Sequence, residues 1–205
     1  MNIFYLHYDT KICAREHCDK HVVKMIVEYA QLLSTAHRIL DGNQYFDKSK
    51  NNRRIHRWKL DEYRENKLYH AVSWNHPSAI WARAEFSHYQ WLWNLASDLC
   101  QEYRHRYGGV NDKQHKTSVV IQKLSFAPDN IPRTGLFSEP PQAMPEECKV
   151  AGDSITAYQN YYRMHKRRFA KWTNRETPHW FQNINNTCKS FQTSDHNLEI
   201  FPSGI

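Results

Sequence analysis

Hydrophobic residues recur at steps of three and four along much of the chain, a spacing that is typical of helices with one buried face. Each of the three longest periodic stretches is preceded by, or contains near its start, a residue that can cap a helix. We expect Asp19, Ser78 and Asp153 to act as these caps, and Gly42 to end the first helix. The predicted long helices cover residues 12–40, 78–107 and 153–172.

The segments between these helices show weaker periodicity. Residues 41–59 are polar and basic and are expected to form a loop, whereas residues 60–72 and 115–124 are expected to form short helices. The sequence Asn75-His76-Pro77 predicts a turn, because the residue before a proline avoids the helical region. Residues 125–150 contain five prolines and predict an irregular connection.

Together these features predict an all-α protein, a single-domain helical bundle with a proline-rich irregular connection before the last helix. The chain has 205 residues, which favours one domain, here expected over residues 1–181 with a polar extension at 182–205. Neither a signal peptide nor an apolar run of membrane-spanning length is visible. Five cysteines without a CxxC pair favour a reducing compartment. We therefore expect a soluble, cytoplasmic protein.

The charge and the aromatic content of the chain indicate that this helical protein acts on nucleic acid. Lys and Arg number 28 against 21 acidic residues, the net charge is +7, and aromatic residues make up 14% of the chain. Positive charge favours polyanions, and aromatic rings can hold unstacked bases. Two basic clusters predict phosphate-binding surfaces: Arg53, Arg54 and Arg57, and then Arg163, Lys166, Arg167, Arg168 and Lys171.

The first long helix carries the densest set of reactive side chains. His17, His21, Lys24 and Glu28 follow one another at steps of four, three and four, so a continuous helix places them on one face. Ionisable groups this close shift one another's pKa, as acid–base chemistry requires. His76, in the turn before the next long helix, is a further catalytic candidate. The alternative is a solvated polar face and a histidine that caps backbone groups.

Metal binding is a second interpretation of the same histidines. His17 and His21 have the i, i+4 spacing that allows two imidazoles to hold one metal, with a third ligand from His76, Asp19 or His37. However, Lys20 and Lys24 would repel a divalent cation, and no HExxH motif is present. The sequence therefore predicts neither a metal nor another cofactor.

One part of the chain resembles a known family. The run Cys18-Asp19-Lys20-His21-Val22-Val23, with Glu28 seven residues after His21, is similar to the first helix of the pyrimidine-dimer DNA glycosylases, the family of phage T4 endonuclease V. The turn Trp74-Asn75-His76-Pro77 resembles the Asn-His-Pro turn of bacterial relatives. The resemblance covers residues 15–107 and suggests a protein of a phage or large virus, acting in the host cytoplasm.

The resemblance implies a DNA glycosylase with AP-lyase activity on double-stranded DNA. In that family an amine attacks C1′ of the sugar to form a Schiff base, and a carboxylate assists. Here Glu28 would be the carboxylate, and His21 would lie in the pocket that receives the displaced nucleotide.

Two positions depart from the family pattern. The family nucleophile is the amine of a small residue exposed by methionine removal, whereas residue 2 here is Asn. We therefore expect Met1 to stay, and the attacking amine to be that of Met1, Lys20 or Lys24. Gln31 stands where the family has an arginine. A metal-dependent helical nuclease and a non-enzymatic viral nucleic-acid-binding protein remain alternatives.

Overall fold

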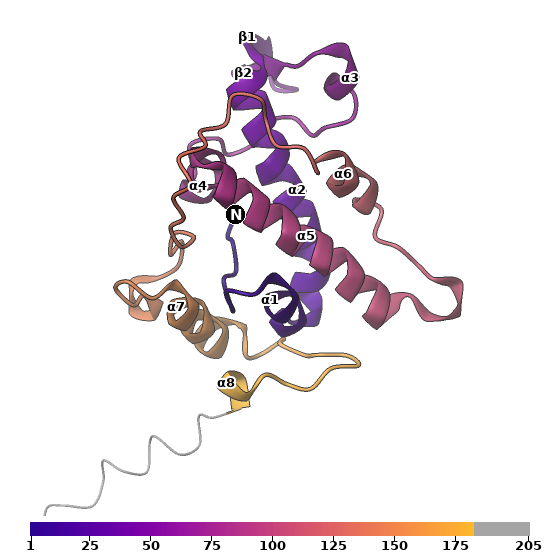
Figure 1. Cartoon of the computed structure of the whole chain (residues 1–205), viewed down its shortest axis with the longest axis vertical. Helices are drawn as coiled ribbons and strands as arrows, with labels where there is room; N and C mark the ends of the chain where they lie inside the picture. The colour runs from indigo at the N-terminus through magenta and orange to yellow at the C-terminus, as the bar shows by residue number, and fades with distance from the viewer. Residues whose placement is uncertain (183–205) are drawn as a thin grey trace, which may run out of the picture.

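The computed structural model describes residues 1–182, which form a mostly helical protein with one two-stranded sheet. Two long helices, α2 (Asp19–Asp41) and α5 (Phe86–Tyr107), cross at its centre (Figure 1). The other elements are α1 (Thr10–Glu16), β1 (Asn43–Lys48), β2 (Arg54–Lys59), α3 (Glu62–Glu65), α4 (Pro77–Ala84), η1 (Gly109–Asn111), α6 (Ser118–Lys123), η2 (Glu146–Cys148), α7 (Ser154–Tyr161), η3 (Tyr162–Lys166) and α8 (His179–Gln182).

The core lies where the apolar stripes of α2 and α5 meet. The stripe predicted from the sequence is buried, with Met25, Ile26 and Leu33 fully inaccessible to solvent on α2. From α5, Leu92 and Leu95 are also fully inaccessible. Burial of each such side chain stabilises the fold by about 1.5–3 kcal/mol, so this crossing anchors the elements around it.

Two of the predicted long helices are interrupted. The first breaks at His17 and Cys18, which have extended backbone angles, and Cys18 rather than Asp19 takes the N-cap position of α2. The second breaks at Glu85, whose φ is −154°. His76, not Ser78, caps α4, because its Nδ1 accepts a hydrogen bond from the Ser78 N–H at 3.1 Å. Gly42 ends α2 as predicted.

The prediction of a loop over residues 41–59 is wrong. Strands β1 and β2 pair antiparallel from Asn43 opposite Lys59 to Lys48 opposite Arg54. All six residues of β1 are exposed, and on β2 only Trp58 is buried. A strand without a buried face lacks the alternation of apolar and polar residues by which strands are usually recognised, and the hairpin therefore passes for a loop in the sequence.

Of the helix predicted over residues 60–72, only the single turn α3 forms. The Arg38 side chain hydrogen-bonds to backbone carbonyl oxygens that would otherwise accept the hydrogen bonds of a longer helix. The Arg38 side chain is 1% exposed and donates hydrogen bonds to the carbonyl oxygens of Trp58, Glu65, Leu68 and Tyr69. A buried guanidinium requires these acceptors. The chain therefore wraps around Arg38 in an irregular path.

The helix predicted over residues 153–172 also ends early. Helix α7 passes into the π-helical turn η3, and the N–H groups of Phe169 and Ala170 both donate to the Lys166 carbonyl oxygen. Trp172 then turns inward, and its indole N–H donates to the Glu16 carbonyl oxygen. The predicted extension at 182–205 lies, except for Gln182, outside the described residues.

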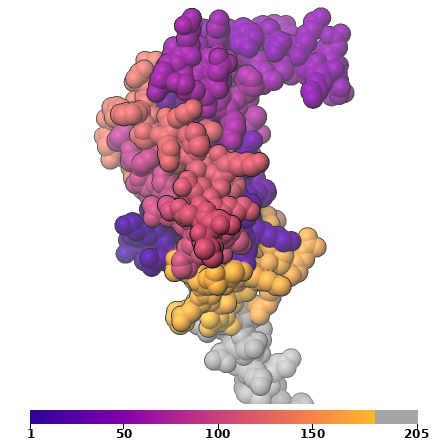
Figure 2. All heavy atoms as spheres, turned by 90° about the vertical axis from the view of Figure 1, so that its right-hand side faces the viewer, coloured from indigo at the N-terminus to yellow at the C-terminus, as the bar shows by residue number. Residues whose placement is uncertain are grey.

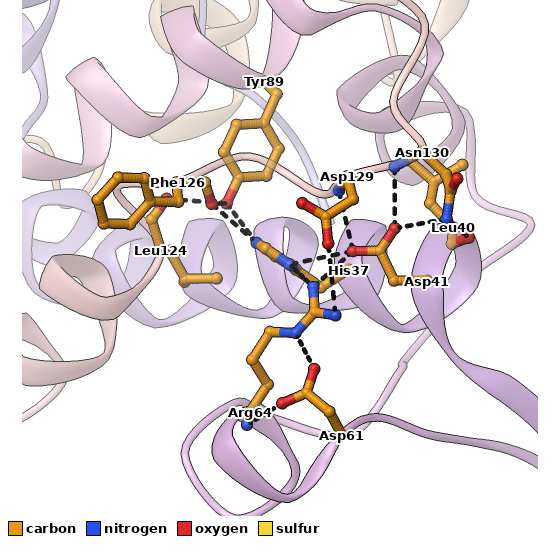
Figure 3. A network of polar contacts seen from close by, with 10 residues as sticks. All are labelled: His37, Leu40, Asp41, Asp61, Arg64, Tyr89, Leu124, Phe126, Asp129 and Asn130. Atoms are coloured by element: carbon orange, nitrogen blue, oxygen red, sulfur yellow. Dashed lines mark hydrogen bonds and ion pairs between the residues drawn. The ribbon is translucent and has the colours of Figure 1, made fainter.

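Residues 125–145 contain neither helix nor strand, and polar contacts hold their first part against the end of α2 (Figure 3). The Asp41 carboxylate accepts hydrogen bonds from the backbone N–H groups of Asp129 and Asn130, both at 3.0 Å, and pairs with Arg64. Next to it, the His37 Nε2 lies 2.9 Å from the Tyr89 hydroxyl and 3.1 Å from the Phe126 carbonyl oxygen. These contacts replace the secondary structure that the prolines prevent.

Within residues 1–182, the helices are too short or too polar to traverse a lipid bilayer.

Candidate active site

The N-terminal segment places Met1 in a pocket between elements that are far apart in the sequence. Residues 3–6 are buried, and two buried hydrogen bonds hold Phe4: its N–H donates to the Tyr29 hydroxyl at 3.1 Å, and the Cys13 thiol donates to its carbonyl oxygen at 3.3 Å. The Ser78 hydroxyl at the start of α4 lies 3.4 Å from the Met1 carbonyl oxygen. Met1 is therefore placed near both α2 and α4 (Figure 1).

This pocket has a volume of about 200 Å³ and contains most of the predicted site. Its walls come from the N-terminal segment, α2 and the α7–η3 region. The residues that line it are Met1, Asn2, Phe4, His21, Lys24, Glu28, Tyr161 and Lys166. Three amines and one carboxylate thus share a small space with a buried imidazole.

His21 is held rigidly in one wall of the pocket. Its ring stacks on Phe4 with centroids 4.2 Å apart, and its Nδ1 lies 2.5 Å from the Tyr162 hydroxyl. Burial, together with the positive charges of His17, Lys166 and Lys24, lowers the pKa of His21 to about 2. His21 is therefore neutral near pH 7.

The hydroxyl of Tyr162 selects the tautomer of this neutral ring. Burial raises the pKa of Tyr162 well above its usual value, so the phenol keeps its proton. When that proton is donated to Nδ1 of His21, the ring hydrogen resides on Nε2. In this state the imidazole offers an N–H donor and not a base.

The charged side chains of the pocket are partly neutralised. Lys24 Nζ lies 2.9 Å from the Glu28 carboxylate, and 66% of the Lys24 side chain but only 16% of the Glu28 side chain is exposed. Lys166 Nζ donates to the Tyr161 hydroxyl at 3.0 Å and lies 4.1 Å from the centre of that ring. Glu28 is thus fixed at the inner end of the ion pair, facing a pocket with excess positive charge.

His76 belongs to the same neighbourhood. Burial lowers its pKa, the positive charge of the N-terminal amine lowers it further, and the charge of Glu28 acts in the opposite direction. Such effects between charges are appreciable only at short range. The Ser78 hydroxyl contacts the Met1 carbonyl oxygen and the Ser78 N–H donates to His76, so the structure places His76 near Met1, but His76 is not among the residues that line the pocket.

The prediction that His17 shares a helical face with His21 is wrong, because the helix breaks between them. His17 ends α1, and its fully buried ring uses both nitrogens, Nδ1 with the Cys13 carbonyl oxygen at 2.7 Å and Nε2 with the Tyr29 hydroxyl at 3.3 Å. Burial lowers its pKa to about 4. His17 therefore lies outside the pocket, in the core. Neither of its ring nitrogens is free to bind a metal shared with His21 and His76.

The first basic cluster lies on the hairpin. Arg53 and Arg54 are exposed, the Arg54 guanidinium lies 3.4 Å from the centre of the Phe46 ring, and Arg57 lies 3.9 Å from Asp47. We call Arg53, Arg54 and Arg57 the hairpin arginines. The surrounding part of the chain forms one end of the molecule (Figure 2). At its base, the Trp58 ring packs on Trp74, two residues before His76.

The second basic cluster divides between the pocket and the surface. Lys166 lines the pocket, whereas the Arg163 side chain donates to the Trp180 carbonyl oxygen and is committed to the fold. Arg167, Arg168 and Lys171 are exposed. Four members of the predicted cluster thus keep an accessible charge next to the pocket or beyond η3.

Phe4, Tyr161 and Tyr162 are site residues that the sequence analysis did not assign to the site. Each belongs to an apolar pattern that signals core packing, and only the fold places them around His21 and Lys166. No local spacing connects residue 4 or 162 to residue 21. The thiol of Cys18, beside His21, is buried, and this burial raises its pKa, which disfavours a nucleophilic role.

Comparisons with models of protein families, with curated proteins and with solved structures found no match for this chain.

Proposed function

We propose that this protein is a DNA-processing enzyme of the base-excision type, a glycosylase and AP lyase that acts on damaged or modified bases in double-stranded DNA. The observation that carries the proposal is that Met1, Glu28, Lys24 and Lys166 line one pocket, while His76 lies beside it, linked through Ser78 to Met1. The resemblance in sequence points to the same residues.

In the proposed reaction, an amine of the pocket forms a bond to C1′ of the target nucleotide while the bond to the base breaks. The base departs with the electron pair of its bond to C1′ and takes up a proton, and the amine loses one. The sugar ring then opens as the C1′–O4′ bond breaks and O4′ takes up a proton, which leaves C1′ bonded to the enzyme as an iminium ion. Removal of a proton from C2′ then expels the 3′ phosphate and cuts the strand. Glu28, held by Lys24, stabilises the cationic intermediate and is positioned to accept a proton.

Met1 is the preferred nucleophile among the three amines. Lys24 is paired with Glu28 and Lys166 is hydrogen-bonded to Tyr161, so both side chains already have partners. An α-amine is in general less basic than a lysine side chain. Lys24 and Lys166, with the N–H of His21, are then available to bind phosphate or sugar oxygens.

The hairpin arginines would hold the duplex beside the pocket. A two-stranded ribbon fits the major groove of DNA, and phosphate contacts from arginine supply affinity without sequence preference. Arg167, Arg168 and Lys171 would contact the backbone on the other side. We propose further that residues 1–181 act as one helical domain, with residues 125–150 as its proline-rich connection, in the cytoplasm of a host cell.

Borohydride trapping tests the proposal directly. The chain is made with Met1 as its first residue and incubated with duplexes that carry an abasic site or a pyrimidine dimer. Reduction of a Schiff base should leave a covalent adduct whose peptide map contains Met1. Glu28→Gln should lose cleavage while DNA binding persists, whereas Glu62→Gln, an exposed carboxylate on α3, should retain both.

Other outcomes would redirect the interpretation. An adduct on Lys24 or Lys166 would keep the reaction and change the nucleophile. Absence of any adduct, with cleavage that depends on an added divalent metal, would favour the nuclease alternative. Binding without cleavage, unaffected by changes at Glu28, would favour a non-enzymatic DNA-binding protein.

A further inference from the structure

A second cluster of reactive side chains lies outside the pocket, between η2 and η3. Potential ligand atoms of Glu147, Cys148 and His165 all lie within 4.8 Å of one another. His165 Nε2 is 3.1 Å from the Glu147 carboxylate, and the Sγ of Cys148 is 3.8 Å from the Sδ of Met164. Cys148 is fully buried, whereas Glu147 and His165 are partly open to solvent.

These separations suit a tetrahedral metal ion. Bonds of about 2.3 Å to sulfur and about 2.0–2.1 Å to nitrogen or oxygen require separations of about 3.8 Å between two sulfur ligands and about 3.3 Å between nitrogen and oxygen ligands. The observed pairs, at 3.8 Å and 3.1 Å, are close to both values. The ligand atoms of Glu147, Cys148 and His165 all lie within 4.8 Å of one another, so only small side-chain movements are needed to direct these three at one centre.

We propose that Glu147, Cys148 and His165 bind a zinc ion, with the Met164 thioether as the nearest fourth group. A thiolate, an imidazole and a carboxylate are the ligands that zinc prefers in proteins. When the metal binds, Cys148 loses its S–H proton to solvent and the thiolate bonds to the metal. With thiolate and carboxylate together carrying two negative charges, the ion is neutralised locally.

Two lysines lie near the cluster. The charge of Lys149 is neutralised by Glu146, which its Nζ contacts at 2.6 Å, whereas Lys166 Nζ donates to the neutral hydroxyl of Tyr161 on the pocket side. The two negative charges of the thiolate and the Glu147 carboxylate outweigh the one positive charge that remains. A cation in the cluster would replace two existing contacts, that between His165 and Glu147 and that between the Cys148 thiol and Met164.

The position of the cluster gives it a structural consequence for the pocket. Turn η3 contains two of the four groups, Met164 and His165, and also Tyr162 and Lys166, which contact or line the pocket. π-Helical turns are rare and occur frequently at functional sites. A metal that joins η2 to η3 would fix this wall of the pocket, so metal loading should raise the melting temperature of the protein.

Metal analysis of the full chain tests this proposal independently of DNA cleavage. Protein purified with zinc and dialysed should retain one equivalent. Replacement by Co²⁺ should give the thiolate charge-transfer band and the visible bands of a tetrahedral site. Cys148→Ser should abolish the charge-transfer band, and His165→Ala should weaken binding at least tenfold.

Cys100→Ser, which changes a partly buried thiol of α5, is the matched control and should leave the spectrum unchanged. Glu147→Gln and His165→Ala alter exposed groups and remain informative if Cys148→Ser does not fold. Failure to retain zinc, or a cobalt spectrum that survives both of these changes, would overturn the assignment.

Discussion

Acidification from pH 7 to pH 5 should destabilise this protein strongly, because three histidines are buried in their neutral form. Burial lowers the pKa of His21 to about 2 and the pKa values of His17 and His37 to about 4. In the unfolded chain each histidine takes up a proton near its usual pKa of 6.5. Their contribution to stability is complete above pH 6.5 and is lost as the pH falls toward the folded pKa.

The size of the loss follows from proton linkage. One pKa unit corresponds to about 1.4 kcal/mol, so each of these histidines loses about 2 kcal/mol between pH 7 and pH 5. The three together lose about 6 kcal/mol. His70, His76, His88 and His115 have pKa values lowered by burial and act in the same direction.

One carboxyl group offsets part of this loss. Burial raises the pKa of Glu16 to about 7, and its Oε2 is buried without a hydrogen-bond partner among the described residues. A carboxyl group with a raised pKa stabilises the fold below its unfolded value of 4.5, and this stabilisation is lost as the pH rises through 7. Between pH 7 and pH 5 Glu16 therefore contributes about 2 kcal/mol in the opposite direction, and the net loss is roughly 4 kcal/mol.

Urea unfolding at pH 7, 6 and 5, followed by tryptophan fluorescence, measures this loss. The variant Glu16→Gln removes the offset and should increase the loss to about 6 kcal/mol over the same range. A free energy of unfolding that does not change between pH 7 and pH 5 would refute the reasoning. An equal loss in both proteins would show that Glu16 is ionised in the folded state.

Three further predictions concern the pocket, the polar contacts of Asp41 and the hairpin. Tyr162→Phe leaves Nδ1 of the buried His21 without its partner, so it should destabilise the protein by about 1–3 kcal/mol; it should also lower kcat more than it changes KM. Asp41→Ala removes a carboxylate with a 3% exposed side chain and should cost about 3–5 kcal/mol, measured by urea unfolding, because Arg64 and two backbone N–H groups lose their acceptor. Replacing the three hairpin arginines by alanine should reduce the slope of log affinity against log salt by about 3, measured by fluorescence anisotropy with duplex DNA; an unchanged slope would remove the hairpin from the DNA-binding surface.

The local sequence was sufficient to predict those features that lie within a single helix. The apolar stripe of α2 and the spacing of His21, Lys24 and Glu28 follow from the helical period, and the structure contains both. The spacing failed at His17 because the helix ends one residue earlier. It failed again at the hairpin, where exposed strands leave no periodic pattern to detect.

The pocket itself was decided by tertiary structure. Met1 and Tyr162 reach the residues of α2 only because the N-terminal segment is buried against Tyr29 and η3 packs against His21, and His76 lies near Met1 because α4 begins beside it. A period of 3.6 residues relates side chains within a few turns of one helix, whereas the Ser78–Met1 and His21–Tyr162 contacts, 77 and 141 positions apart, depend on how whole elements pack. The sequence by itself therefore determined which reactive groups α2 presents, and packing determined what surrounds them.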